Sequence, residues 1–256
     1  MPRMMRRLYV ALAIGPLAAC ATAGKDNGLG EHPDAGGNKP DGSTQPPIDA
    51  APLPDAPPGQ TQLTLSQTNN NTPAAGQGQA CGHSVFGNTV STADNSWYRV
   101  FKLADYGVTG AFNVQRVTFY SDYAWAGGGT SQPATLKIGT YSGALEVDRL
   151  PAASITNIVT QPVTIPDNTG APAAIDTNVS ATIPAGSNLI VELALPDGDA
   201  DGNYFYIGVS AGGEQKKGYI RATPSGCGFT SPTSLVSPTG LNIANNAVLL
   251  SVTGTK

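Results

Sequence analysis

The sequence predicts an all-β fold: an antiparallel β-sandwich, jelly-roll-like, preceded by a disordered linker. Gly and Pro are abundant, with 31 and 21 of the 256 residues, whereas only 12% of the residues are charged. From Thr61 onward, short alternating or wholly apolar runs are separated by Gly, Pro, Asn and Asp. This region shows no helical period, so strands joined by turns are the economical architecture.

Residues 1–19 are predicted to be a signal peptide. Basic residues in 1–7 precede the uncharged run 8–19, which is too short for the roughly 20 residues of a membrane-spanning helix. Leu17-Ala-Ala-Cys20 resembles the lipobox of bacterial lipoproteins, which implies lipidation of Cys20 with chains such as palmitate. Because Ala21 rather than Asp follows, the resemblance also implies the outer membrane or cell surface. The alternative is an ordinary cleaved signal with an incidental cysteine.

Residues 20–60 are expected to be the lipidated cysteine and a disordered tether. The segment is Gly, Pro, Asp, Ala and Asn with almost no large apolar residue, so it cannot bury enough surface to offset its ordering entropy. Its proline-dense part is semi-extended and would hold a domain away from a membrane.

Residues 61–256 form the predicted β-sandwich domain. In 188–195, alternate leucine and valine residues fall on one face of the pleat, which predicts a core strand. Ile183-Pro-Ala-Gly-Ser187 predicts the turn before it. The expected strands are 62–66, 97–103, 112–121, 134–141, 154–159, 175–183, 188–195, 204–210, 218–222 and 247–252.

The cysteines add a covalent expectation. With Cys20 assigned to lipid, Cys81 and Cys227 remain as an even pair in an oxidising compartment, and we expect a disulfide between them. A zinc site that uses both cysteines and His83 is the competing interpretation, but it offers only three ligands without a recognisable spacing.

Several segments carry a resemblance to a known kind of module. Ser96-Trp-Tyr-Arg-Val-Phe-Lys-Leu103, Gln132-Pro-Ala-Thr-Leu-Lys-Ile138 and Asn203-Tyr-Phe-Tyr-Ile-Gly208 occur in order with Tyr219-Ile-Arg221 and Cys227-Gly228. Together they resemble a β-sandwich module found in many secreted bacterial proteins, over roughly 77–254. That module recurs beside adhesion domains and secreted hydrolases, so the resemblance implies an accessory role.

One loop has the composition of a cation site. Asp197, Asp199 and Asp201 alternate, Gly202 follows, and the carbonyl of Asn203 is placed as in the calcium loop of an EF-hand. The closing Glu is missing, because residue 208 is Gly. The loop thus predicts a candidate calcium site, and a solvated hairpin turn is the alternative.

Aromatic residues suggest a ligand surface. Tyr123 and Trp125 share parity with Phe119 and precede a Gly-rich loop, so we expect them at a sheet edge or loop tip, where rings stack on sugars and Asp122 binds hydroxyls. The alternative is that these rings pack in the core or at its rim. By the same alternation, Trp97 is predicted to be a core residue.

Other features narrow the function. The net charge of −4 becomes three units more negative once the signal's arginines are removed, which disfavours nucleic acid as a partner. No catalytic residue is singled out: His83 has no nucleophile elbow, and no spacing selects a pair among Asp94, Asp105, Asp122, Glu146, Asp148 and Glu192. We therefore expect a non-catalytic module, bound to the membrane by lipid, that binds polysaccharide or a surface protein. A structural envelope lipoprotein and a secreted hydrolase are the alternatives.

Overall fold

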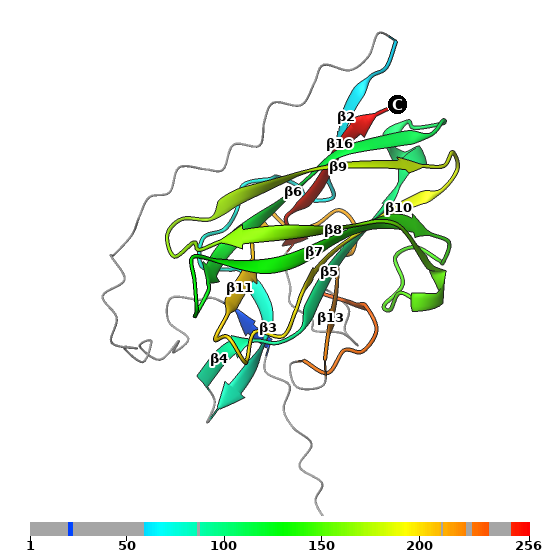
Figure 1. Ribbon diagram of the computed structural model, residues 1–256. Coiled ribbons are helices and arrows are strands. Elements are labelled where there is room, and N and C mark those ends of the chain that lie inside the picture. The colour runs from blue at the N-terminus through cyan, green and yellow to red at the C-terminus, as the bar shows by residue number, and fades with distance from the viewer. Residues whose placement is uncertain (1–19, 23–58, 86–87, 211, 224–226, 236–246) are drawn as a thin grey trace, which may run out of the picture.

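The computed structural model describes residues 20–22, 59–85, 88–210, 212–223, 227–235 and 247–256. Over these residues the chain is an antiparallel β-sandwich whose sheets curl into a half-barrel (Figure 1), which confirms the predicted fold class. Two short 3-10 turns, Leu103–Tyr106 and Ala152–Ser154, interrupt the strands. No helix in this part of the chain is long and apolar enough to cross a membrane. The predicted signal, 1–19, lies outside the described residues, as does 23–58 of the predicted tether, 20–60. Cys20–Thr22, which the sequence assigns to the disordered tether, is instead a short strand paired with 79–81.

One sheet, here called the β6 sheet, is built around the long strand β6. In spatial order it joins β1, β3, β11, β6, β16 and β2, with β4 beside β3 and β9 beside β6. The bounds are β1 Cys20–Thr22, β2 Gln62–Leu65, β3 Gln79–Val85, β4 Asn88–Thr92, β6 Phe112–Trp125, β9 Ala173–Ile183, β11 Tyr204–Ile207 and β16 Leu250–Thr255.

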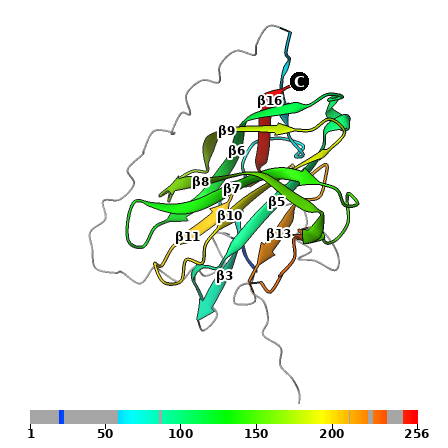
Figure 2. The same cartoon turned by 45° about the vertical axis from the view of Figure 1, so that its right-hand side comes forward.

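The facing sheet, here called the β10 sheet, runs in the order β14, β13, β5, β10, β7, β8. Figure 2 shows its strands crossing in front of the β6 sheet. The bounds are β5 Asn95–Lys102, β7 Ser131–Tyr141, β8 Ile155–Pro166, β10 Asn188–Leu195, β13 Tyr219–Ala222 and β14 Thr233–Ser234. A short pair, β12 Val209–Ser210 and β15 Ala247–Val248, completes the described strands.

The structure corrects some of the expected strands. The expected strand 204–210 is broken at Gly208, because its N–H donates to Tyr120 and its carbonyl accepts from Leu249. The strands β3 and β4 were not expected, because their Gly, Ser, Asn and Thr residues lack apolar alternation. By contrast, β10 has the predicted bounds.

The core lies between the two sheets. Trp97 of the β10 sheet meets Phe205 of the β6 sheet edge-on at 5.6 Å between ring centroids, and Phe205 meets Phe119 at 6.5 Å. All three side chains are fully buried, as is Phe101. Burial of each large side chain contributes roughly 1.5–3 kcal/mol, so this layer holds the sheets together.

A buried ion pair fastens residues 212–218 to the sandwich. Arg99 is 0% exposed, and its Nη1 donates to Oε2 of Glu214 at 2.8 Å. Its Nε and Nη2 donate to the carbonyl oxygen of Val248. Burial raises the pKa of Glu214, and the guanidinium opposes that shift. Because removal of one partner strands the other charge, this pair is a structural element of the fold.

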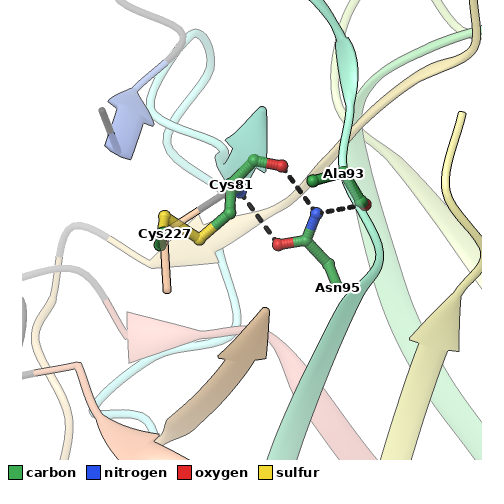
Figure 3. The surroundings of a disulfide bond; sticks show 4 residues. All are labelled: Cys81, Ala93, Asn95 and Cys227. Atoms are coloured by element: carbon green, nitrogen blue, oxygen red, sulfur yellow. Dashed lines mark hydrogen bonds between the residues drawn. A yellow bond between two sulfur atoms is a disulfide. The ribbon is translucent and has the colours of Figure 1, made fainter. Parts of the chain in front are cut away.

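The expected disulfide is present. Cys81 of β3 is bonded to Cys227, with 5.4 Å between their Cα atoms, and so links the β6 sheet to the segment after β13 (Figure 3). The Asn95 side chain supports it: its Oδ1 accepts from Cys81 N, and its Nδ2 donates to the carbonyl oxygens of Cys81 and Ala93. With both sulfurs joined, the zinc interpretation falls.

Candidate ligand-binding surface

A β-bulge in β6 decides where its aromatic side chains point. Tyr123 pairs with Tyr206 of β11, but the next pair is Ser121 with Ile207, so Asp122 is the extra residue. A bulge of this kind reverses the alternation of faces along a strand. The shared parity of Phe119 and Tyr123 therefore does not place them together: Phe119 faces the core, and Tyr123 faces outward.

The bulge creates a cluster of four aromatic residues on the outer face of the β6 sheet. Trp125 lies opposite Tyr204, and Tyr123 lies opposite Tyr206 with ring centroids 6.1 Å apart. Between them Phe205 and Ala124 point into the core and are 0% exposed. We call Tyr123, Trp125, Tyr204 and Tyr206 the aromatic patch. Tyr206 is its buried base, and the other three are partly exposed.

The patch belongs to a paired strand. Ala124 exchanges backbone hydrogen bonds with Asn168, and Gln132 Nε2 donates to the carbonyl oxygen of Tyr204. The expectation of a sheet edge or loop tip for Tyr123 and Trp125 is therefore wrong. A rigid position is favourable for binding, because little ordering is needed when a ligand arrives.

Tyr123 and Tyr204 of the patch remain neutral phenols above physiological pH, because burial raises the pKa of both. Burial raises the pKa of Tyr123, and Tyr204 and Asp167 act in the same direction. Burial likewise raises the pKa of Tyr204. A neutral phenol can both donate and accept a hydrogen bond, as sugar hydroxyls require.

Asp122 supports the patch from behind. It is 5% exposed, and its carboxylate accepts hydrogen bonds from the backbone N–H groups of Gly76 at 3.0 Å and Gly78 at 2.7 Å. A Cβ on Gly78 would lie 2.8 Å from that of Tyr206, so only glycine lets this loop approach. Asp122 thus holds the loop over Tyr206 rather than presenting its oxygens beside the rings.

The Asp197–Asn203 loop packs beside the patch. Its Asp197 Oδ1 lies 2.8 Å from His83 Nε2, and Asp199 Oδ1 accepts from Ser91. Asn203 Oδ1 accepts from Gly127 N, in the turn that follows Trp125. The loop therefore braces the end of β6.

Of the predicted calcium ligands, Asp197, Asp199 and Asn203 already make hydrogen bonds within the protein. The Asn203 carbonyl oxygen, which corresponds to position 7 of an EF-hand loop, accepts a hydrogen bond from Thr92 N at 2.9 Å. Among the described residues, no group of three His, Cys, Asp or Glu side chains is placed to hold a metal ion. Calcium binding through Asp197, Asp199, Asp201 and Asn203 stays a prediction, and a melting temperature that a chelator leaves unchanged would remove it.

The acidic residues considered for catalysis all engage groups of the protein. Asp94 pairs with Arg221, Glu192 with Lys137, and Asp148 with Lys217. Asp105 lies 3.5 Å from Lys102 Nζ, and Glu146 accepts from the Lys217 N–H. The geometry therefore does not single out a catalytic pair.

Sequence comparison adds no relative to this description: no protein-family model matches the chain, and no curated protein matches it.

Proposed function

We propose that this chain is a lipid-anchored surface protein whose sandwich binds polysaccharide without catalysis, through the aromatic patch. One observation carries the proposal: two cross-strand aromatic pairs, Trp125 with Tyr204 and Tyr123 with Tyr206, on an outer sheet face. The apolar face of a sugar ring packs against such rings, while phenol hydroxyls hydrogen-bond its hydroxyls.

The surroundings of the patch support this reading over core packing. Phe205 and Ala124 fill the inner side of the same strands. Tyr206 belongs to the hydrophobic core, whereas Tyr123, Tyr204 and Trp125 keep part of their surface exposed, the two tyrosines while packing against that core. The backbone around them is held by Asp122, Gln132 and Asn168. Fixed rings beside fixed polar groups are typical of small-ligand sites.

The site is tested by a glycan array probed with the purified chain, with calcium present. We expect retention on polysaccharide, and a loss of tenfold or more in affinity for Trp125→Ala and Tyr204→Ala. Ile158→Ala is the matched control, because Ile158 is 43% exposed on β8, in the other sheet. No binding to any glycan would favour a structural envelope lipoprotein. Turnover of an ester or glycoside would favour a hydrolase.

The proposed location at the outer membrane or cell surface rests on the lipobox-like sequence before Cys20. The Cys81–Cys227 disulfide supports an oxidising compartment outside the cytoplasm. In detergent phase separation of cell extracts, the wild-type protein should enter the detergent phase. Cys20→Ser should move the processed protein to the aqueous phase. Processed Cys20→Ser protein, with the signal removed as judged by its mass, that still enters the detergent phase would contradict the lipid anchor.

A further inference from the structure

The outer face of the β6 sheet holds a second feature, at the opposite end of β6 from the aromatic patch. A groove of about 450 Å3 lies there. Its polar lining consists of Gln60, Asn113, Gln115, Asn178, Ser180, Thr182 and Thr255. Val114, Val179 and Ala181 line the groove as well, and no charged side chain takes part. We call it the amide groove.

An irregularity of the strands opens the amide groove. The pairing of β6 shifts between Val114 and Arg116 on both sides, against β9 and against β16. Gln115 is thereby left outside the ladder and lines the groove. Bulges commonly re-aim one side chain in this manner.

Gln115 also carries an unused hydrogen-bonding atom. Its Oε1 is buried and has no hydrogen-bond partner in the described part of the chain. A buried acceptor without a donor is costly. The terminal torsion of glutamine is broad, so a ligand hydroxyl in the groove can recruit this oxygen by a small rotation.

The amide groove and the aromatic patch share one continuous face. Asn113 at one end and Trp125 at the other lie on the outer side of β6, about 40 Å apart at 3.3–3.4 Å per residue. Hydroxyl groups of Thr118, Tyr120 and Thr253 occupy the surface between them. Arg116 and Asp176, the charged pair on this stretch, neutralise each other at 3.2 Å.

The face therefore suits a ligand that is long, uncharged and rich in hydroxyls. The rings of the patch could pack against a protein as well as a sugar, but the stretch between the patch and the groove carries hydroxyls rather than large apolar side chains, which favours a hydroxyl-rich ligand. Ile158, the exposed large apolar residue of the described chain, lies on the other sheet. We infer that the ligand is a linear neutral glycan of several sugars, which lies along β6 with one end on the aromatic patch and the other in the amide groove.

This inference rests on the proposed function and is tested by chain length. Neutral linear oligosaccharides of two to eight sugars, in several linkages, are titrated by calorimetry against the chain, with acidic oligomers alongside. Affinity should rise at least tenfold from the disaccharide to the octasaccharide, which is long enough to reach from the aromatic patch to the amide groove. Gln115→Ala and Asn178→Ala should abolish that gain and leave disaccharide binding unchanged, whereas Trp125→Ala should weaken both.

The outcomes separate the two claims. Affinity that is independent of length, yet lost in Trp125→Ala, would overturn the extended site and leave the aromatic patch. A preference for acidic oligomers would also overturn the inference. Binding to no oligomer would remove both. Circular dichroism and melting temperature of Gln115→Ala and Asn178→Ala should match the wild type, and Ile158→Ala again serves as the control for an unrelated exposed site.

Discussion

The outer faces of the two sheets differ, although both sheets alternate in the same manner. On the β10 sheet a second apolar cluster covers the outer face: Tyr98, Val100, Tyr141, Leu150, Ile190 and Tyr219 are all buried. Residues 142–154, between β7 and β8, supply Leu145, Val147 and Leu150 to this cluster. On the β6 sheet the outward positions carry hydroxyls, amides and the aromatic patch.

This difference separates stability from recognition. The outer face of the β10 sheet, here called the covered face, buries apolar area and contributes to folding. The outer face of the β6 sheet is here called the open face. The open face, where β9 exposes Asn178, Ser180 and Thr182, contributes little to stability and is free to vary with a ligand. Substitutions on the two faces should therefore have opposite consequences.

The largest effect is expected at Tyr141. Its side chain is 2% exposed, and its hydroxyl donates to the Ala144 carbonyl oxygen at 3.0 Å, which holds residues 142–154 in place. Tyr141→Ala should lower the free energy of unfolding by about 3–5 kcal/mol, measured by urea denaturation, with glycan binding unchanged in the folded protein. Tyr204→Ala on the open face should cost about 1 kcal/mol. Equal losses would erase the distinction between the faces.

The second largest effect is expected at alkaline pH, where ionisation of a buried tyrosine on the covered face should lower the stability of the protein. Burial, aided by the charge of Glu192, raises the pKa of Tyr98 to about 12 from 10.0. The raised pKa means that this stabilisation is complete below pH 10 and is lost as the pH rises toward 12. The loss is about 2–3 kcal/mol. Tyr98→Phe should make the decline in stability shallower, and Tyr204→Phe should change it less. An identical decline in Tyr98→Phe would contradict the assignment.

A loss of intermediate size is expected behind the aromatic patch. Asp122→Asn keeps one acceptor oxygen for two backbone donors and should lower the free energy of unfolding by about 1–3 kcal/mol. Thermal unfolding measures this loss. Burial raises the pKa of Asp122 above 3.8, so its stabilisation is present below that pH and falls as the pH rises through the folded value. The variant should lack this dependence. Asp105→Asn, at an exposed ion pair, should leave stability unchanged.

The smallest effect is expected on the open face between the two proposed subsites. Thr253 Oγ1 lies 2.9 Å from Thr64 Oγ1 across β16 and β2, and the pair is exposed. Thr253→Ala should change the free energy of unfolding by less than about 0.5 kcal/mol. A loss above 2 kcal/mol in a denaturant titration would show that this face is structural after all.

Much of the fold could be predicted, because alternation along strands such as β10 reports directly which side chains are buried. The disulfide followed from the cysteine count. The strand β3 could not be predicted, since its stability comes from long-range contacts such as Asn95 with Cys81 rather than from local propensity.

The site was predicted only in part. Tyr123 and Trp125 were identified, but the bulge at Asp122 placed them on the other face, and a bulge is set by the partner strand. The partners Tyr204 and Tyr206 became part of the site only through cross-strand register. The sequence did not indicate the amide groove, because Asn, Ser and Thr on the outer side of β9 are also typical of an ordinary solvent-exposed strand face.

The Cys81–Cys227 bond has a mechanical consequence. If the protein is held at Cys20 and pulled through a glycan on the aromatic patch, as proposed, the load reaches the sandwich through the chain that precedes Cys81 and through the pairing of β1 with β3. The aromatic patch and the part of the amide groove on β6 and β9 lie within the covalent ring that this bond closes, whereas Gln60 and Thr255 of the groove lie outside it. Under force, β2 can peel from β16, but the ring cannot be drawn out past Cys81. The ligand would thus stay bound to the aromatic patch even after β2 has separated from β16.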